Sequence, residues 1–85
     1  MGSRLGSERT DSLAKLLRFL DRLDGARIAY SLIHARDSIN VLVTASGSER
    51  WEVEFFEDGH VEVEVFRSGK SAMEGEEALE RLFTL

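Results

Sequence analysis

Four glutamates in the second half of the chain are the residues best placed to carry chemistry. Glu52 and Glu54 alternate with apolar residues in one run, and Glu62 and Glu64 alternate with valines in the next. Because successive side chains of a strand point to opposite faces, this spacing puts each pair on a single face. Carboxylates gathered in this way can bind a basic side chain, hold a cation, or keep the face hydrated.

Two interpretations of this glutamate-rich face stay open. Alternating valine and glutamate is typical of a sheet with one solvated side, which is the simplest interpretation. Leu42, Phe56 and Phe66 fall on the same predicted face, and acidic residues mixed with apolar ones favour a recognition surface. The predicted partner-binding residues are therefore Glu52, Glu54, Glu62, Glu64, Leu42, Phe56 and Phe66.

A metal site is a weaker hypothesis for the same strands. His60, Glu62 and Glu64 alternate along one predicted strand, and Glu54 is expected across from Glu62. An imidazole with carboxylates could bind a divalent cation. Any strand of the form His-x-Glu-x-Glu looks the same, however, and a histidine beside a turn needs no metal. We expect neither a metal nor a cofactor.

Catalytic groups are scarce in the rest of the chain. His34, Arg36 and Asp37 could place a general base beside a carboxylate. They fall at a predicted hairpin turn, where aspartate is favoured for its local backbone hydrogen bonds. The chain has no cysteine, no Gly-x-Ser-x-Gly nucleophile elbow and no glycine-rich phosphate loop. We therefore predict that the protein is not an enzyme.

An amphipathic helix over residues 10–24 is predicted to support this surface. Its apolar stripe, which must dock on another element, consists of Leu13, Leu16, Leu17, Leu20 and Leu23. Thr10, Asp11 and Ser12 are candidate N-caps, and Gly25 is expected to adopt the left-handed conformation that ends the helix. Residues 1–7 read as a tag or linker, which leaves residues 8–85 as one domain.

Four strands are predicted to follow the helix as an antiparallel meander, because only short breaks separate them. Their predicted ranges are 27–35, 38–45, 49–56 and 60–66. Gly69 is expected in the turn after the fourth strand. A short helix over residues 75–83 closes the chain, so the expected fold is α+β with the order α-β-β-β-β-α.

The hydrophobic pattern also selects the register of these strands. A three-residue loop with Gly59 left-handed pairs Phe55 with Val61, whereas a two-residue turn would set Phe55 opposite Glu62 and mix the faces. The predicted apolar face comprises Ile28, Tyr30, Leu32, Ile39, Val41, Val43, Trp51, Val53, Phe55, Val61, Val63 and Val65. The same register sets Glu54 opposite Glu62 and Glu52 opposite Glu64.

Charge and composition narrow the classes of partner. The chain has 85 residues and a net charge of -5, and residues 48–85 carry eleven acidic and only four basic side chains. That balance argues against nucleic-acid binding, which requires phosphate neutralisation, and suits a basic protein partner. No apolar run approaches the roughly 20 residues needed to span a membrane. The absence of cysteine fits the cytoplasm.

One resemblance rests on two segments of this chain. The hairpin ERWEVEFFEDG with the following VEVE, at residues 49–59 and 61–64, and the segment GEEALE at residues 75–80 resemble a group of small bacterial proteins of unknown function. The resemblance covers most of residues 13–83. Its motif is a hairpin pattern rather than a catalytic signature, so it implies no activity.

Three functional hypotheses follow from the sequence. The first is a non-enzymatic interaction module that presents an acidic sheet face to a basic partner, by analogy of shape and charge with immunity proteins, antitoxins or small chaperone-like dimers. The second is a structural homodimer that associates through sheets or edge strands, with Ile33, Leu42, Phe56 and Phe66 at the contact. The third is a metal-binding protein.

Overall fold

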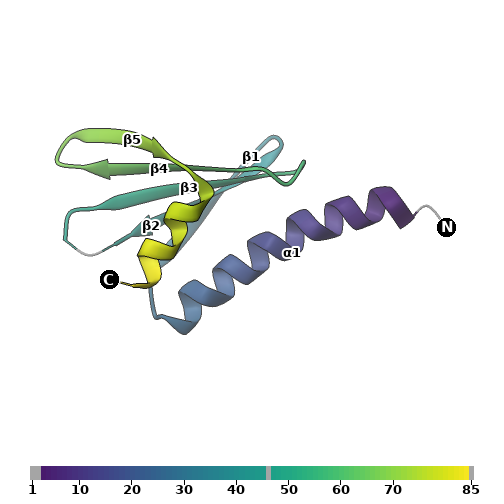
Figure 1. The fold of residues 1–85 in the computed structure, drawn as a ribbon, viewed down its shortest axis with the longest axis horizontal. Coiled ribbons are helices and arrows are strands. Elements are labelled where there is room, and N and C mark those ends of the chain that lie inside the picture. Colours follow the sequence, from purple (N-terminus) through teal and green to yellow (C-terminus); the bar gives the residue numbers. More distant parts are fainter. Residues whose placement is uncertain (1–2, 46, 85) are drawn as a thin grey trace.

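Helix α1 (Ser3–Gly25) lies across one face of an antiparallel sheet in the computed structural model, which describes residues 3–45 and 47–84 (Figure 1). The strands are β1 (Tyr30–Ala35), β2 (Ser38–Thr44), β3 (Arg50–Phe56), β4 (Val61–Arg67) and β5 (Lys70–Glu74). They are ordered β1-β2-β3-β4-β5, and the 3-10 helix η1 (Glu76–Phe83) closes the chain. The fold is therefore α+β with a five-stranded meander.

The predicted register is confirmed throughout the first four strands. Phe55 pairs with Val61, and Gly59 has a φ of +96° in the three-residue loop that joins their strands. Val43 pairs with Trp51, and Leu32 pairs with Val41. A slip of one residue would turn every buried valine of these strands outward, which is why the pattern determines the register.

The prediction of four strands is wrong, because β5 adds a fifth beside β4. Ser68 and Gly69 form a two-residue turn in which both have positive φ, +49° and +80°, and this geometry returns the chain as a hairpin. The turn at Gly69 was expected, but the strand after it was not. As a consequence β5, and not β4, is the second edge of the sheet.

Both predicted ends of the first helix need correction. Helix α1 begins at Ser3, so Thr10, Asp11 and Ser12 lie inside it and are not N-caps. At the other end Arg27, and not Gly25, takes the left-handed conformation with a φ of +59°.

The hydrogen bonds after α1 show how the helix is capped, with Arg27 as the left-handed residue. The Ile28 amide donates to the Leu23 carbonyl at 2.9 Å, and the Arg27 amide donates to the Asp24 carbonyl at 3.1 Å. This pair of bonds is a Schellman motif, in which the left-handed residue sits two positions beyond the predicted one. The same conformation keeps Arg27 out of the first strand, which begins only at Tyr30.

The C-terminal element is a 3-10 helix rather than the expected α-helix. Its first residue is Glu76, with Gly75 extended before it. Leu79 and Leu82 are three residues apart and therefore nearly eclipsed in a 3-10 helix, so both reach the sheet and are buried. Arg22 of α1 holds the element in place through two hydrogen bonds to the Glu80 carboxylate, at 2.8 and 3.0 Å.

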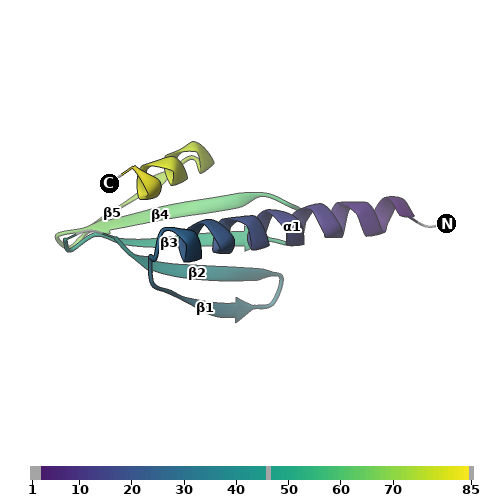
Figure 2. The same cartoon turned by 90° about the horizontal axis from the view of Figure 1, so that it is seen from below.

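The core lies on one side of the sheet only, where α1 and η1 pack beside each other (Figure 2). Its buried residues are Phe19, Leu23, Val41, Val43, Trp51, Val53, Phe55, Val63, Val65, Ala78, Leu79 and Leu82. Trp51 is 1% exposed, as expected for a core aromatic. The opposite side of the sheet carries the predicted glutamates, and no described element covers it.

Candidate functional site

The acidic face is the side of the sheet turned away from α1, and we define it by Glu52, Glu54, Glu62 and Glu64. Strands β3 and β4 position these residues, because each strand alternates between the core and the acidic face. Glu54 is paired with Glu62 and Glu52 with Glu64, as the sequence predicts. Like charges directly opposite each other destabilise a sheet, so this arrangement has a cost.

A small hollow of about 40 Å³ lies at the centre of the acidic face. It is lined by Asn40, Glu52, Glu54, Glu62, Glu64 and Met73. Asn40 of β2 is paired with Glu54 across the strands, and its Oδ1 atom is buried without a hydrogen-bond partner among the described residues. A buried acceptor that lacks a donor costs about 1–3 kcal/mol, so this oxygen calls for an explanation.

The four carboxylates differ in their contacts. Ser38 donates its hydroxyl to Glu54 Oε2 at 2.6 Å, and Arg50 Nη2 lies 3.6 Å from Glu52 Oε2. Glu62 Oε2 lies 3.3 Å from His60 Nε2. Glu64 forms no hydrogen bond or ion pair with any other described residue. Acceptor capacity at the centre of the face therefore exceeds the donors that the described residues supply.

The apolar residues predicted for this surface lie on it and are half-buried. Leu42 is next to Glu52 across β2 and β3. Phe56, at one end of the face, stacks on the His60 ring with centroids 4.1 Å apart. At the other end the Arg50 guanidinium lies 4.3 Å from the centre of the Phe66 ring. The face thus has an acidic centre between two aromatic ends, each covered by a basic or titratable side chain.

His60 links the acidic face to the loop between β3 and β4. Its Nδ1 lies 2.6 Å from Asp58 Oδ1, and this hydrogen bond, with a weaker contribution from Glu62, raises the pKa of His60 above its ordinary value. The pKa of Asp58 is lowered, chiefly because its carboxylate accepts the backbone N–H of His60. Within the described part of the chain, no group of three or more such side chains is arranged to hold a metal ion.

Asn40, Ser38, Arg50 and Met73 belong to the acidic face but were missed by the sequence analysis. A signal was present, because Asn40 and Ser38 share strand parity with Leu42, which was assigned to this face. Met73 could not have been found, because it lies on the unpredicted strand β5. The lack of a donor for Asn40 depends on three-dimensional contacts and has no signature in the sequence.

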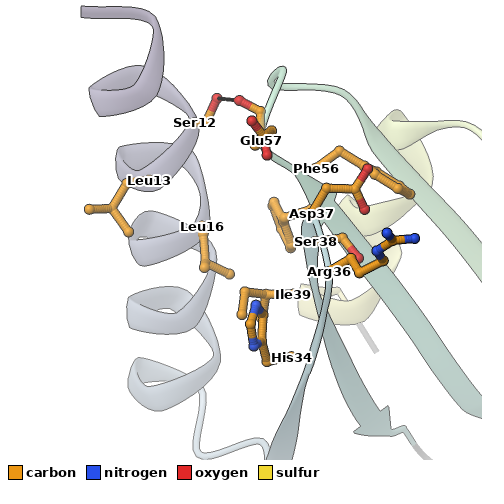
Figure 3. Close-up of a pocket in the computed structure, with 11 residues that line it drawn as sticks. Ser12, Leu13, Leu16, His34, Arg36, Asp37, Ser38, Ile39, Phe56 and Glu57 are labelled. Atoms are coloured by element: carbon orange, nitrogen blue, oxygen red, sulfur yellow. Dashed lines mark hydrogen bonds between the residues drawn. The ribbon is translucent and has the colours of Figure 1, made fainter. Parts of the chain in front are cut away.

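The cluster of His34, Arg36 and Asp37 lies at the turn between β1 and β2, where the sequence placed it. These residues do not reach the acidic face. They stand instead at one end of a groove of about 570 Å³ between α1 and the β1–β2 hairpin (Figure 3). Leu13 and Leu16 form the α1 side of this groove, and nothing in it assembles a nucleophile with a base.

Two general findings complete the description of the molecule. Neither of the described helices has the combination of length and apolar character that crossing a lipid bilayer requires. Comparison of the chain with protein-family models, with curated proteins and with solved structures finds no match.

Proposed function

We propose that the protein is a non-enzymatic, cytoplasmic interaction module whose acidic face receives a basic side chain of a protein partner. The observation that carries this proposal is the central hollow, which is lined by four carboxylate side chains and by Asn40. Lysine and arginine side chains offer donors and no acceptors, so they complement such a site.

An arginine fits the hollow better than a lysine. The guanidinium presents five N–H donors in a planar fork and pairs with carboxylates in a bidentate geometry. Glu52 and Glu64 are directly opposite each other on β3 and β4 and both line the hollow, so one fork can reach both carboxylates. The half-buried Leu42 adds apolar surface for the aliphatic stem of the same side chain.

A bound cation would also remove the cost of the empty face. The paired glutamates repel each other and the Asn40 oxygen lacks a donor, so the free protein is less stable than an apolar face would make it. A guanidinium bound between the glutamates removes their repulsion. The arrangement is therefore suited to binding, because this unfavourable term of the free state is absent from the bound state.

The test is a titration of the labelled protein with the blocked tripeptide Gly-Arg-Gly, followed by NMR. We expect shifts at the backbone amides of Asn40, Glu52 and Glu64, with an affinity on the order of millimolar for so small a ligand. The same peptide with citrulline in place of arginine is the control, since it keeps the shape and loses the charge. Equal shifts from both peptides, or shifts confined to other residues, contradict the proposal.

A matched pair of variants separates the acidic face from general acidity. The E52Q/E64Q variant should weaken arginine-peptide binding at least about tenfold, while E57Q/E77Q, with the same change in net charge at exposed positions elsewhere, should leave it within about twofold. Pull-down of cellular proteins with each of these two variants, at low and at high salt, extends the test to whole protein partners. A partner held equally by both variants does not use this face.

A further inference from the structure

Exposed apolar side chains are concentrated at the β1 end of the molecule. The large hydrophobic residues with high exposure are Leu13 (55%), Leu17 (49%), Leu32 (49%), Ile33 (51%) and Met73 (62%). All of them except Met73 belong either to the flank of α1 or to β1. Helix α1 runs over the middle of the sheet and η1 lies on the β4 side, so neither covers this end (Figure 2).

The groove between α1 and the β1–β2 hairpin lies at this end of the molecule. Leu16 of α1 points toward Ile39 of the sheet across the groove (Figure 3), and Leu13 and Phe55 also line it. Its volume of about 570 Å³ lies beside the outer strand of the sheet. A neighbouring strand added to β1 would extend the sheet beside this groove and cover Leu32.

The hydrogen bonds between the ends of β2 and β3 determine which backbone N–H and C=O groups of β1 point away from the sheet. The Ala45 amide donates to the Glu49 carbonyl, and the Glu57 amide donates to the Asp37 carbonyl. The odd-numbered residues of β2 therefore face β3, and its even-numbered residues face β1. By the register of β1 with β2, Ser31, Ile33 and Ala35 face inward. The N–H and C=O groups of Tyr30, Leu32 and His34 consequently point away from the sheet.

The two edges of the sheet differ in charge. Strand β5 has Lys70 and Glu74 at its ends, and charged residues at an edge discourage pairing with another chain. Strand β1 has the sequence Tyr-Ser-Leu-Ile-His-Ala and carries no aspartate, glutamate, lysine or arginine. For a protein of net charge -5, such a strand is a place where two copies can meet without setting like charges opposite each other.

We propose that two copies of the chain associate through antiparallel pairing of their β1 strands, with the two-fold axis at Leu32. The two meanders then form one continuous sheet, and both α1 helices lie on the same side of it. The interface is self-complementary, because each copy contributes the same uncharged edge strand and the same exposed leucines beside it. This association leaves the Glu52–Glu64 pair free and is independent of the function proposed above.

The outward backbone groups select this register among the alternatives. With the axis at Leu32, each Leu32 pairs with its counterpart, and Tyr30 pairs with the second copy's His34. All three outward-facing residues of both strands then exchange hydrogen bonds. A shift of the axis to residue 31 or 33 leaves one outward-facing residue of each strand unpaired.

Cross-linking tests the register directly, because the chain contains no cysteine. Directly opposite residues of a hydrogen-bonded antiparallel pair have Cα atoms about 5.5 Å apart, within the range for a disulfide. Under mild oxidation L32C should form a covalent dimer. S31C on the same strand faces the second copy's Ile33, and M73C lies on the opposite edge, so both should cross-link at least about tenfold more slowly.

Introducing a charge at the axis provides a second, non-covalent test, measured by analytical ultracentrifugation. L32K places two ammonium groups opposite each other and L32E two carboxylates, so each variant alone should raise the dimer dissociation constant at least about tenfold. An equimolar mixture of the two should restore the dimer. M73K, an equally drastic change at the other edge, should leave the dissociation constant unchanged.

Several outcomes overturn the proposal. If the parent protein sediments as a monomer at every concentration, the chain does not pair with itself, and β1 is free to pair with a strand of another protein. A dimer that survives in both L32K and L32E, or that M73K dissociates, is formed elsewhere on the surface. Equal cross-linking of S31C and L32C contradicts the axis at Leu32. Circular dichroism of each variant establishes that loss of the dimer is not loss of the fold.

Discussion

The two faces of this sheet lie on the same strands and have opposite properties. Along β3, Trp51, Val53 and Phe55 are buried, while the intervening Glu52 and Glu54 face the other side. On the covered face α1 and η1 bury the side chains of the central strands, although Leu32 of the edge strand β1 remains 49% exposed. The acidic face sets carboxylates opposite one another and leaves the Asn40 oxygen without a described donor.

This contrast shows that the alternation of the strands puts the apolar core on one face and the paired carboxylates on the other. Burial of apolar side chains under α1 and η1 stabilises the fold, so substitutions there should reduce the free energy of unfolding. The acidic face contributes little to the core and contains terms that oppose folding. Replacement of the paired glutamates or of Asn40 by neutral or apolar residues should therefore increase the free energy of unfolding, which is the opposite sign.

The largest effect is expected for Trp51→Ala on the covered face. Removing this side chain leaves a cavity in the core beside Arg81, whose guanidinium lies 5.5 Å from the centre of the ring, and a fully buried aromatic costs about 3–5 kcal/mol when it is cut back to alanine. Against a total stability of about 5–15 kcal/mol, such a loss brings the domain close to unfolding. Urea denaturation followed by circular dichroism measures it.

The matched control for that variant is Phe66→Ala on the acidic face. Phe66 is half-buried and packs under the Arg50 guanidinium, so its loss should cost distinctly less than that of Trp51. Equal losses of stability in the two variants would show that both faces support the fold, and the proposed separation of roles would fail.

The second prediction concerns the orphaned oxygen of Asn40. Asn40→Leu replaces an unsatisfied buried acceptor by an apolar group of similar size, and we expect a gain of about 1 kcal/mol in the free energy of unfolding. Thr44→Leu, at an exposed position of the same strand, should change stability by less than about 0.5 kcal/mol. If Asn40→Leu is destabilising, the oxygen has a donor in solution and the hollow is already satisfied.

Sequence reasoning predicted the register and the acidic pairs because one physical constraint determines both. The valines of β2, β3 and β4 can be buried together in only one alignment, and the glutamates between them must then face each other. Helix α1 was predicted from its leucine stripe, but the stripe docks only in part: Leu13 and Leu17 are exposed, and Phe19, outside the predicted stripe, is buried. These features depend on the apolar pattern within each element.

The features that were missed depend on neighbours instead of on local pattern. Strand β5 has no alternation of apolar residues, and it forms because the turn at Ser68 and Gly69 sets it beside β4. The left-handed residue at the end of α1 was assigned to Gly25 from residue preference, whereas the Schellman bonds place it at Arg27. The orphaned oxygen of Asn40 is likewise defined by the surrounding side chains.

The third prediction is the removal of the charge ladder itself. A variant with Glu52, Glu54, Glu62 and Glu64 all changed to Gln removes two like-charge pairs while keeping an oxygen that can accept the Ser38 hydroxyl. We expect a gain of about 0.5–1 kcal/mol at neutral pH and low salt, measured by thermal unfolding. The gain should shrink as salt is added, because ions screen the repulsion in the parent protein.

If this variant and the parent unfold at the same temperature in low salt, the glutamates are ordinary solvated residues and the acidic face has no cost to recover by binding. The E57Q/E77Q variant controls for overall acidity, because it removes two negative charges, half as many as the ladder variant, at exposed glutamates that do not face each other. A gain in that control of half the size or more would mean that overall acidity, rather than the paired arrangement, opposes folding.

The smallest effect is expected from His60, which stands at the edge of the acidic face. Its pKa is raised first by the hydrogen bond to Asp58 and then by Glu62, so the folded protein holds this proton more tightly than the unfolded chain does. The resulting stabilisation is complete below the ordinary histidine pKa of about 6.5 and is lost as the pH rises through the raised value.

Asp58→Asn removes the main cause of the raised pKa of His60 and should lower that pKa toward the ordinary value. An NMR titration of the His60 ring in the parent and the variant measures the shift, and thermal unfolding as a function of pH should show a flatter profile for the variant near neutrality. Because Glu62 keeps its contact with His60, part of the shift should persist, and E62Q combined with D58N should remove it. An unchanged His60 titration in D58N would show that the loop carboxylate does not hold the proton, and that the edge of the acidic face is charged independently of this loop.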